Sequence, residues 1–283
     1  MRLNPFNPGS INVGRAGGGG GMPGGKIGCG GLIVVLIGAL VFGIDPASML
    51  GTMDSVQGPQ QQQISNESAA EICDDNEYAM ETCRAFASLD ETWARRFQEE
   101  GIGDRFQRPT LYFVGGRTVS SACGTTSSGV GPFYCPGDQG IYIDTGFYDQ
   151  LARMAGNGGD FARLYVVAHE YGHHVQNITG IAGSLRQQQQ RNPRNANQIQ
   201  VGMELHADCY AGVWAGQNRN MIEAGDLEEG LAAASAIGDD TLTGGRVSSE
   251  NFTHGTSAQR MAALRLGMET GDDSRCDSEI LGR

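Results

Sequence analysis

The sequence has little positive charge. Lys26 is its only lysine, and 20 lysines and arginines stand against 32 aspartates and glutamates, which gives a net charge of −12 at pH 7. The arginines are scattered between acidic residues. Binding to nucleic-acid phosphates requires a basic stripe that displaces counterions. We therefore expect no nucleic-acid partner.

The sequence also lacks the Cys-x2-Cys spacing of zinc ribbons and zinc fingers, although cysteine is present. The region after residue 70 holds an even number of cysteines, which is typical of a disulfide framework in an oxidising compartment. The pairs closest in sequence could cross-link local loops, but spacing alone leaves the connectivity open. These cysteines are Cys73, Cys83, Cys123, Cys135, Cys209 and Cys276.

The N-terminal part differs from the rest of the chain. Residues 1–26 are rich in glycine and poor in apolar side chains, which predicts a disordered tail. Residues 27–44 carry no charge and have the length of a transmembrane helix. Basic residues precede this run and acidic residues follow it, so we expect a single-pass bacterial membrane protein with a cytoplasmic N-terminus and an extracytoplasmic domain. A cleaved signal peptide is the alternative, but no small-x-small site follows the run.

A single folded domain is expected at residues 71–283, after a glutamine-rich tether at residues 45–70. Short aromatic and β-branched runs predict a small sheet, and residues 140–145 are either an edge strand for an extended substrate or an ordinary core strand. The fold class is therefore α+β, mainly helical. The helices are expected in residues 71–100, 161–176, 201–218, 226–237 and 257–268, from apolar side chains at helical spacing.

The strongest chemical motif is the run from His169 to His173. Residues four apart lie on one face of a helix, so both histidines can bind one metal ion. Glu170 lies beside that face and can take a proton from a water activated by the metal. Gly172 is expected to leave space beside the ion. This pattern predicts a catalytic zinc site.

A third ligand is expected on a second apolar helix. Glu204 supplies a carboxylate there, and Asp208 follows one turn later. Asp208 can accept the outer N–H of a zinc-bound histidine, most simply His169, and so fix the ring's tautomer. The predicted ligands are thus His169, His173 and Glu204.

Four segments together resemble a known family. HEYGHHVQ and ELHADCYAGVW are typical of gluzincin metallopeptidases, and with GPFYCPGDQGIYID upstream and NFTHGTSAQR downstream they resemble a bacterial family of neutral zinc metallopeptidases. The resemblance implies a zincin-like fold, one zinc ion, an N-terminal membrane anchor and hydrolysis of peptide bonds in a protein or peptide substrate.

The remaining histidines are assigned less specific roles. His254 precedes a helix that Thr256 or Ser257 can cap, and it is either a donor to the oxyanion of the reaction or a structural residue. His174 is expected to pack near the ligands, and His206 to face away from Glu204. Arg260 is expected to pair with a core carboxylate.

Two other functions remain open at this stage. The domain could be a membrane-tethered binding or scaffold module in which zinc only stabilises the fold. It could also be a zinc amidohydrolase acting on a small or cell-wall substrate, because a metal site does not fix the substrate. An intact Glu170 favours a catalytic site over a structural one.

Overall fold

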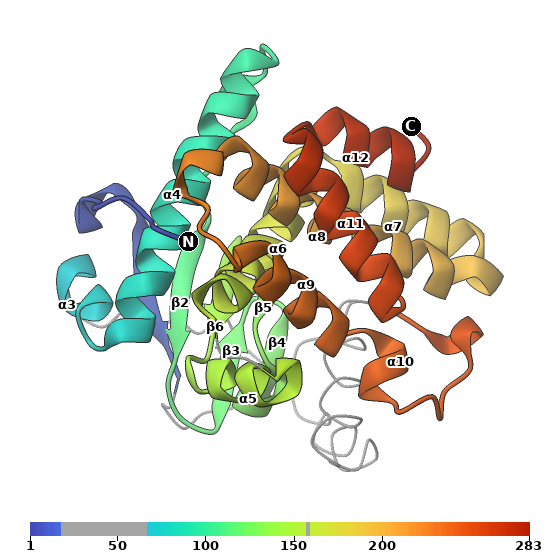
Figure 1. Cartoon of the computed structure of the whole chain (residues 1–283), viewed down its shortest axis with the longest axis horizontal. Helices are drawn as coiled ribbons and strands as arrows, with labels where there is room; N and C mark the ends of the chain where they lie inside the picture. The colour runs from blue at the N-terminus through green and yellow to red at the C-terminus, as the bar shows by residue number, and fades with distance from the viewer. Residues whose placement is uncertain (18–66, 157–158) are drawn as a thin grey trace.

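The computed structural model describes residues 1–17, 67–156 and 159–283, which form an α+β domain with more helix than strand (Figure 1). The predicted fold class is thus confirmed. The strands are β1 (Asn12–Ala16), β2 (Thr110–Val114), β3 (Thr118–Ser121), β4 (Gly124–Ser127), β5 (Phe133–Cys135) and β6 (Gly140–Ile143). The helices are α3 (Ala69–Cys73), α4 (Glu77–Glu99), α5 (Gly146–Ala155), α6 (Asp160–Ile178), α7 (Ile181–Arg191), α8 (Ala196–Gln217), α9 (Asp226–Ala236), α10 (Asp239–Leu242), α11 (Ser257–Thr270) and α12 (Asp273–Ile280).

Four strands form the main sheet, in the order β1-β2-β6-β5. β1, β2 and β6 are parallel, and β5 runs antiparallel to β6. Strand β6 lies inside the sheet with all four of its residues buried. Residues 140–143 therefore form a core strand, and β5 occupies the edge position that sequence alone left open for residues 140–145.

Side chains alternate between the two faces of this sheet, as strand geometry requires. Leu111 and Ile141 point into the main hydrophobic core with the helices. On the other face the ring of Tyr142 stacks between those of Tyr112 and Phe133, with centroid distances of 4.9 and 4.7 Å. The hairpin of β3 and β4 contributes Val119 to this second, smaller cluster.

The N-terminal residues belong to the folded domain. Strand β1 pairs with β2, and the α-amino group of Met1 lies 2.9 Å from carboxylate oxygens of both Asp160 and Asp226. The prediction of a disordered tail is therefore wrong for residues 1–17. A glycine run that follows β1 dominates the composition of the first 26 residues. The composition was judged over this whole region, and the short strand within it was therefore missed.

The predicted transmembrane run at residues 27–44 and most of the tether lie outside the described residues, and both stay predictions. Within the described ranges, no helix combines the length and apolar character that a membrane crossing needs. Arg15 and Glu67, which stand near the two ends of the undescribed segment 18–66, form an ion pair with an N–O distance of 2.8 Å. The chain thus leaves and re-enters the domain at neighbouring points.

The central helices α6, α8 and α11 pack closely and form the layer that carries the candidate site (Figure 1). A side chain at Gly172 would place its Cβ 2.9 Å from the carbonyl oxygen of Ala207, a contact tighter than folded proteins tolerate. Gly172 is therefore required for the close approach of α6 to α8. Gly172 was expected to leave space beside a metal ion, but the contact that it permits is the one with α8.

Three disulfides cross-link the domain: Cys73–Cys83, Cys123–Cys135 and Cys209–Cys276. The two local pairs are those that lie closest in sequence, and the third ties α8 to α12.

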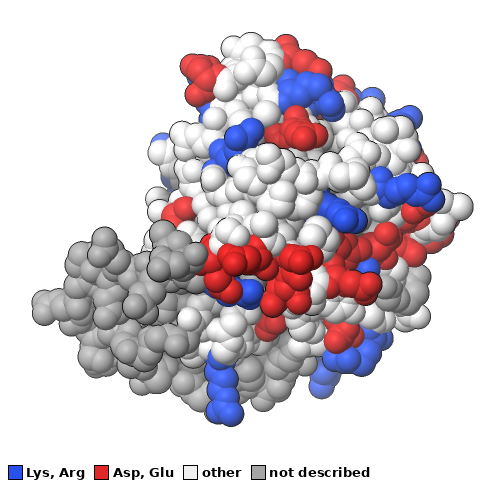
Figure 2. Space-filling model, turned by 90° about the vertical axis from the view of Figure 1, so that its left-hand side faces the viewer, with Lys and Arg blue, Asp and Glu red and all other residues white. Residues whose placement is uncertain are grey.

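Acidic side chains gather in a band on the side of the molecule that carries α3 (Figure 2). The negative charge of the composition is thus partly concentrated on one face.

Candidate metal centre

Helices α6 and α8 bring three predicted ligands together. One ligand atom from each of His169, His173 and Glu204 lies within 4.8 Å of the others. The Nε2 atoms of His169 and His173 lie 3.3 and 3.4 Å from Oε2 of Glu204. All three side chains are at least four-fifths buried. Two imidazole nitrogens and one carboxylate oxygen converge on a single point, as the motif predicted.

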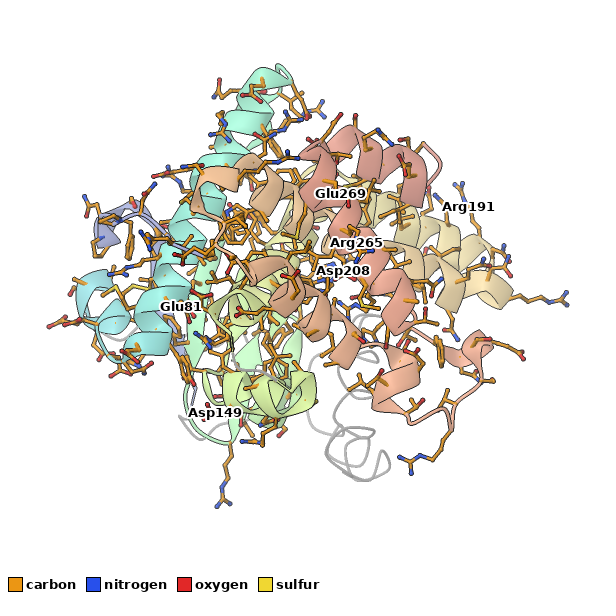
Figure 3. All side chains as sticks on the ribbon, viewed as in Figure 1. Glu81, Asp149, Arg191, Asp208, Arg265 and Glu269 are labelled. Atoms are coloured by element: carbon orange, nitrogen blue, oxygen red, sulfur yellow. A yellow bond between two sulfur atoms is a disulfide. The ribbon has the colours of Figure 1, made fainter. Side chains whose placement is uncertain are left out.

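His169 is held by a buried polar group on its far side. Its Nδ1 lies 2.7 Å from Oδ1 of Asp208, which also accepts a hydrogen bond from the hydroxyl of Tyr165 at 2.6 Å. Asp208 is fully buried and lies at the centre of the helical layer (Figure 3). Arg260 on α11 donates to both carboxylate oxygens of Asp208 at 2.8 Å. Asp208 thus orients His169, and Arg260 compensates its charge.

The other two candidate ligands are each hydrogen-bonded to a glutamine side chain. Nδ1 of His173 lies 2.9 Å from Oε1 of Gln176, one turn later on α6. Gln200 on α8 donates to Oε1 of Glu204 at 2.8 Å and accepts from Gln189 on α7 at 3.1 Å. Helix α7, which contains the glutamine run at residues 187–190, thus contributes to the support of Glu204 through Gln200.

The electrostatics of the cluster favour a cation between its members. Burial opposes protonation of His169, but Asp208 and Glu204 raise its pKa to about 9. Burial likewise disfavours the ionised form of Glu204, yet the neighbouring histidines hold its pKa well below its usual range. The cluster therefore attracts positive charge, which either protons or a metal ion can supply. Its N, N and O donors form the three-ligand set of catalytic zinc sites.

Glu170 follows His169 directly and is 8% exposed. Burial opposes protonation of His173, but the charges of Glu204 and, to a smaller extent, Glu170 raise its pKa. Glu170 therefore lies close enough to the ligands for its charge to act on them.

His254 lies on the loop before α11 and is 5% exposed. Its Nδ1 is 3.1 Å from Oδ1 of Asp239, whose other oxygen accepts the backbone N–H groups of residues 253–255. Nε2 of His254 is buried and has no hydrogen-bond partner within the described ranges. The charge of His254 also contributes to the lowered pKa of Glu204. The contact at Nδ1 thus orients the ring of His254 near the cluster, and Nε2 is available to bind another group.

Sequence reasoning brought the candidate ligands together but missed most of the groups around them. No sequence motif marks Gln176, Gln200 or Asp239. The two glutamines stand three or four residues from a candidate ligand, and this spacing alone indicated a contact. His174 packs as expected: its Nε2 donates to the carbonyl of Gln107 at 2.6 Å. His206 contacts Gln176 and Asp277.

A second group of carboxylates, Asp160, Asp226 and Glu229, lies at the start of α6 and α9. The α-amino group of Met1 bonds to Asp160 and Asp226 within it. Asp160 is the first residue of α6, and its carboxylate bonds to this amino group. The positively charged α-amino group therefore lies within hydrogen-bonding distance of both carboxylates.

Comparisons with known proteins agree with the metal centre. The protein YpfJ of Escherichia coli (strain K12), described as uncharacterized, is 42% identical over 263 residues, which cover 91% of this chain and 88% of YpfJ. The uncharacterized protein Rv2575 of Mycobacterium tuberculosis (strain H37Rv) is 40% identical over 215 residues, which cover 69% of this chain and 70% of Rv2575. No solved structure matches the chain significantly. The sequence model of the family described as "Putative neutral zinc metallopeptidase" matches residues 7–279, and the chain therefore belongs to this family.

Proposed function

We propose that this protein hydrolyses peptide bonds in protein or peptide substrates with one zinc ion held by His169, His173 and Glu204. The observation that carries the proposal is the convergence of these three ligand atoms within 4.8 Å on two helices that pack directly together. The zincin-like fold belongs to the same proposal. When bound, zinc supplies a Lewis acid that polarises the scissile carbonyl and acidifies a water molecule.

The chain's own residues supply the remaining chemistry. Glu170 accepts the proton of the attacking water and passes it to the leaving amine. His254 in its doubly protonated form donates a hydrogen bond from Nε2 to the oxyanion, while its Nδ1–H donates to Asp239, which balances the charge of the ring and fixes its orientation. Asp208 keeps Nδ1 of His169 protonated, which leaves Nε2 of His169 as the ligand atom.

The test is zinc content followed by peptide hydrolysis, both measured on the purified full-length protein. We expect one zinc per chain in the wild type and a large loss in His169→Ala and Glu204→Ala. Glu170→Gln should keep its zinc and lose hydrolysis of a mixed peptide library followed by mass spectrometry. A folded wild type that binds no zinc, or a Glu170→Gln variant that cleaves at the wild-type rate, would contradict the proposal.

We further propose that the domain is extracytoplasmic and contacts the bilayer through residues 27–44. Three disulfides support an oxidising compartment. If residues 27–44 crossed the bilayer once, β1 and β2 would lie on opposite sides of the membrane. The two strands pair in one sheet, so the proposal places residues 12–16 on the same side as the domain. This replaces the cytoplasmic N-terminus expected from the charge pattern.

Cysteine labelling tests this placement. Asn12 and Arg191 are both exposed, one before and one after the apolar run. Cysteines introduced at either position should react with a membrane-impermeant maleimide in intact spheroplasts, with Cys29 replaced by serine in both variants. Labelling at residue 191 alone would place the two segments on opposite sides and overturn the shared placement.

A further inference from the structure

A chain of hydrogen bonds runs from the ligand His173 to the C-terminal helix α12. It passes from His173 to Gln176 at 2.9 Å, from Gln176 to His206 at 3.1 Å, and from His206 to Asp277 at 2.8 Å. Gln176 and His206 are fully buried, whereas the side chain of Asp277 is 31% exposed. The chain thus connects the metal centre to the surface at α12.

The donors and acceptors of this chain fit together in only one direction. Asp277 accepts the N–H of Nε2 of His206, so Nδ1 of His206 accepts from the amide nitrogen of Gln176. The same amide nitrogen donates to the carbonyl of Met203 at 2.7 Å, which leaves Oε1 of Gln176 as the acceptor for Nδ1 of His173. His173 is therefore protonated on Nδ1, and its Nε2 presents a lone pair toward Glu204 and His169.

A rotated Gln176 amide would undo this arrangement. Its nitrogen would face Nδ1 of His173 and force the ring proton onto Nε2, the atom that must bind a metal. The amide oxygen would then face Nδ1 of His206 and the carbonyl of Met203, where two acceptors would repel it. The bond from His206, itself fixed by Asp277, thus selects the ligand-competent tautomer of His173.

Helix α12 is anchored to α8 next to Asp277. The Cys209–Cys276 disulfide joins α12 to α8 at the residue before Asp277, and Tyr210 donates a hydrogen bond to Oδ1 of Asp277 at 3.0 Å. Cys209 and Tyr210 follow Asp208 directly on α8. One short stretch of α8 therefore holds both outer supports: Asp208 for His169, and the anchor of Asp277 for His173.

We propose that Asp277, acting through His206 and Gln176, is a positioning residue for His173, and that α12 is thereby part of the metal centre. This inference rests on the proposed zinc site and assigns a function to residues outside the ligand set. Outer partners of zinc-bound histidines typically change metal affinity by about 10- to 100-fold. We expect about 10-fold weaker zinc binding in Gln176→Leu and a few-fold in Asp277→Ala, which is further from the metal.

The experiment measures zinc affinity by competition with a chelator, and the visible spectrum of the cobalt(II)-substituted protein, in full-length variants. Asp277→Ala should bind zinc more weakly and change the cobalt bands, whereas Asp277→Asn, which keeps an acceptor oxygen for His206, should restore both toward wild type. The matched control is Asp273→Ala, which removes a mostly buried ion pair with Arg96 from the same helix. It should lower thermal stability and leave zinc affinity and the cobalt spectrum unchanged.

The outcomes separate this inference from the proposed function. A wild type that binds no zinc overturns both. A wild type that binds zinc, with Asp277→Ala unchanged in affinity and spectrum, overturns the inference alone. Equal weakening in Asp277→Ala and Asp273→Ala also overturns it, because the effect would then come from a general loosening of α12. If Gln176→Leu fails to fold, the comparison of the three variants on α12 still decides.

Discussion

Arg260 donates from Nε and Nη2 to the two carboxylate oxygens of Asp208, each at 2.8 Å, with both side chains buried. Burial opposes ionisation of Asp208, but Arg260 and His169 hold its pKa at about 2. The carboxylate that contacts His169 therefore keeps its charge inside the core because α11 supplies the opposite charge.

Removal of that guanidinium should be costly. Arg260→Ala leaves a buried, uncompensated carboxylate, and we expect a loss of about 3 to 5 kcal/mol in the free energy of unfolding. Arg275→Ala, which removes an exposed ion pair with Glu279, should change stability by less than about 0.5 kcal/mol. Denaturant titration of both variants measures the difference. Similar unfolding midpoints for the two would contradict the role of Arg260.

The contact between α6 and α8 should be sensitive to one added methyl group. Gly172→Ala places Cβ against the backbone of Ala207, so the helices that carry the ligands must shift, at a cost of about 1 to 3 kcal/mol. Zinc affinity should fall with stability. Gly183→Ala on α7 meets nothing within 4 Å and should raise helix stability by about 0.5 to 1 kcal/mol. If Gly172→Ala is as stable as wild type and binds zinc equally well, the close contact is not required.

Stability should depend on pH through Asp90. Burial raises the pKa of Asp90 from 3.8 to about 7, against the hydrogen bond from Tyr171 and the charge of Arg108. The folded state then holds this proton more tightly than the unfolded chain, so the contribution is present at low pH and is lost as pH rises toward 7. The slope approaches about 1.4 kcal/mol per pH unit.

Unfolding titrations between pH 4 and pH 8 measure this contribution. Asp90→Asn keeps an acceptor for Tyr171 and removes the titrating group, so its free energy of unfolding should fall less over this range than that of wild type. Asp74→Asn, at an exposed position after α3, should follow the wild-type curve. Parallel curves for wild type and Asp90→Asn would exclude Asp90 as the source.

Asp239 and His254 should affect turnover without affecting the metal. His254→Ala removes the proposed oxyanion donor, and loss of one such donor typically lowers kcat by about 100- to 1000-fold. Asp239→Asn should lower kcat by a smaller factor because the ring loses its charged partner. Thr253→Val removes only the contact of Oγ1 with Nδ1 and serves as the control. If zinc content falls in His254→Ala, a structural role for this residue is the better account.

The convergence of the three candidate ligands was predictable because helical spacing alone brings His169 and His173 to one face, and Glu204 lies on a second apolar helix. The order of the segments also indicated the family. The supports of the ligands were not predictable in the same way, because Gln176 reaches His206 and Asp277 only through tertiary packing. β1 was missed for a related reason: its five residues are too short to show a pattern, and they form a strand only beside β2.

The position of β1 also bears on how the chain folds. β1 is synthesised well before its partner β2, which begins at Thr110, so their pairing must wait until that part of the chain exists. Until β1 docks, β2 presents an unpaired edge that can join another chain. Newly made protein is therefore expected to be most prone to aggregation at this step, and a chaperone that covers the edge of β2 would protect it.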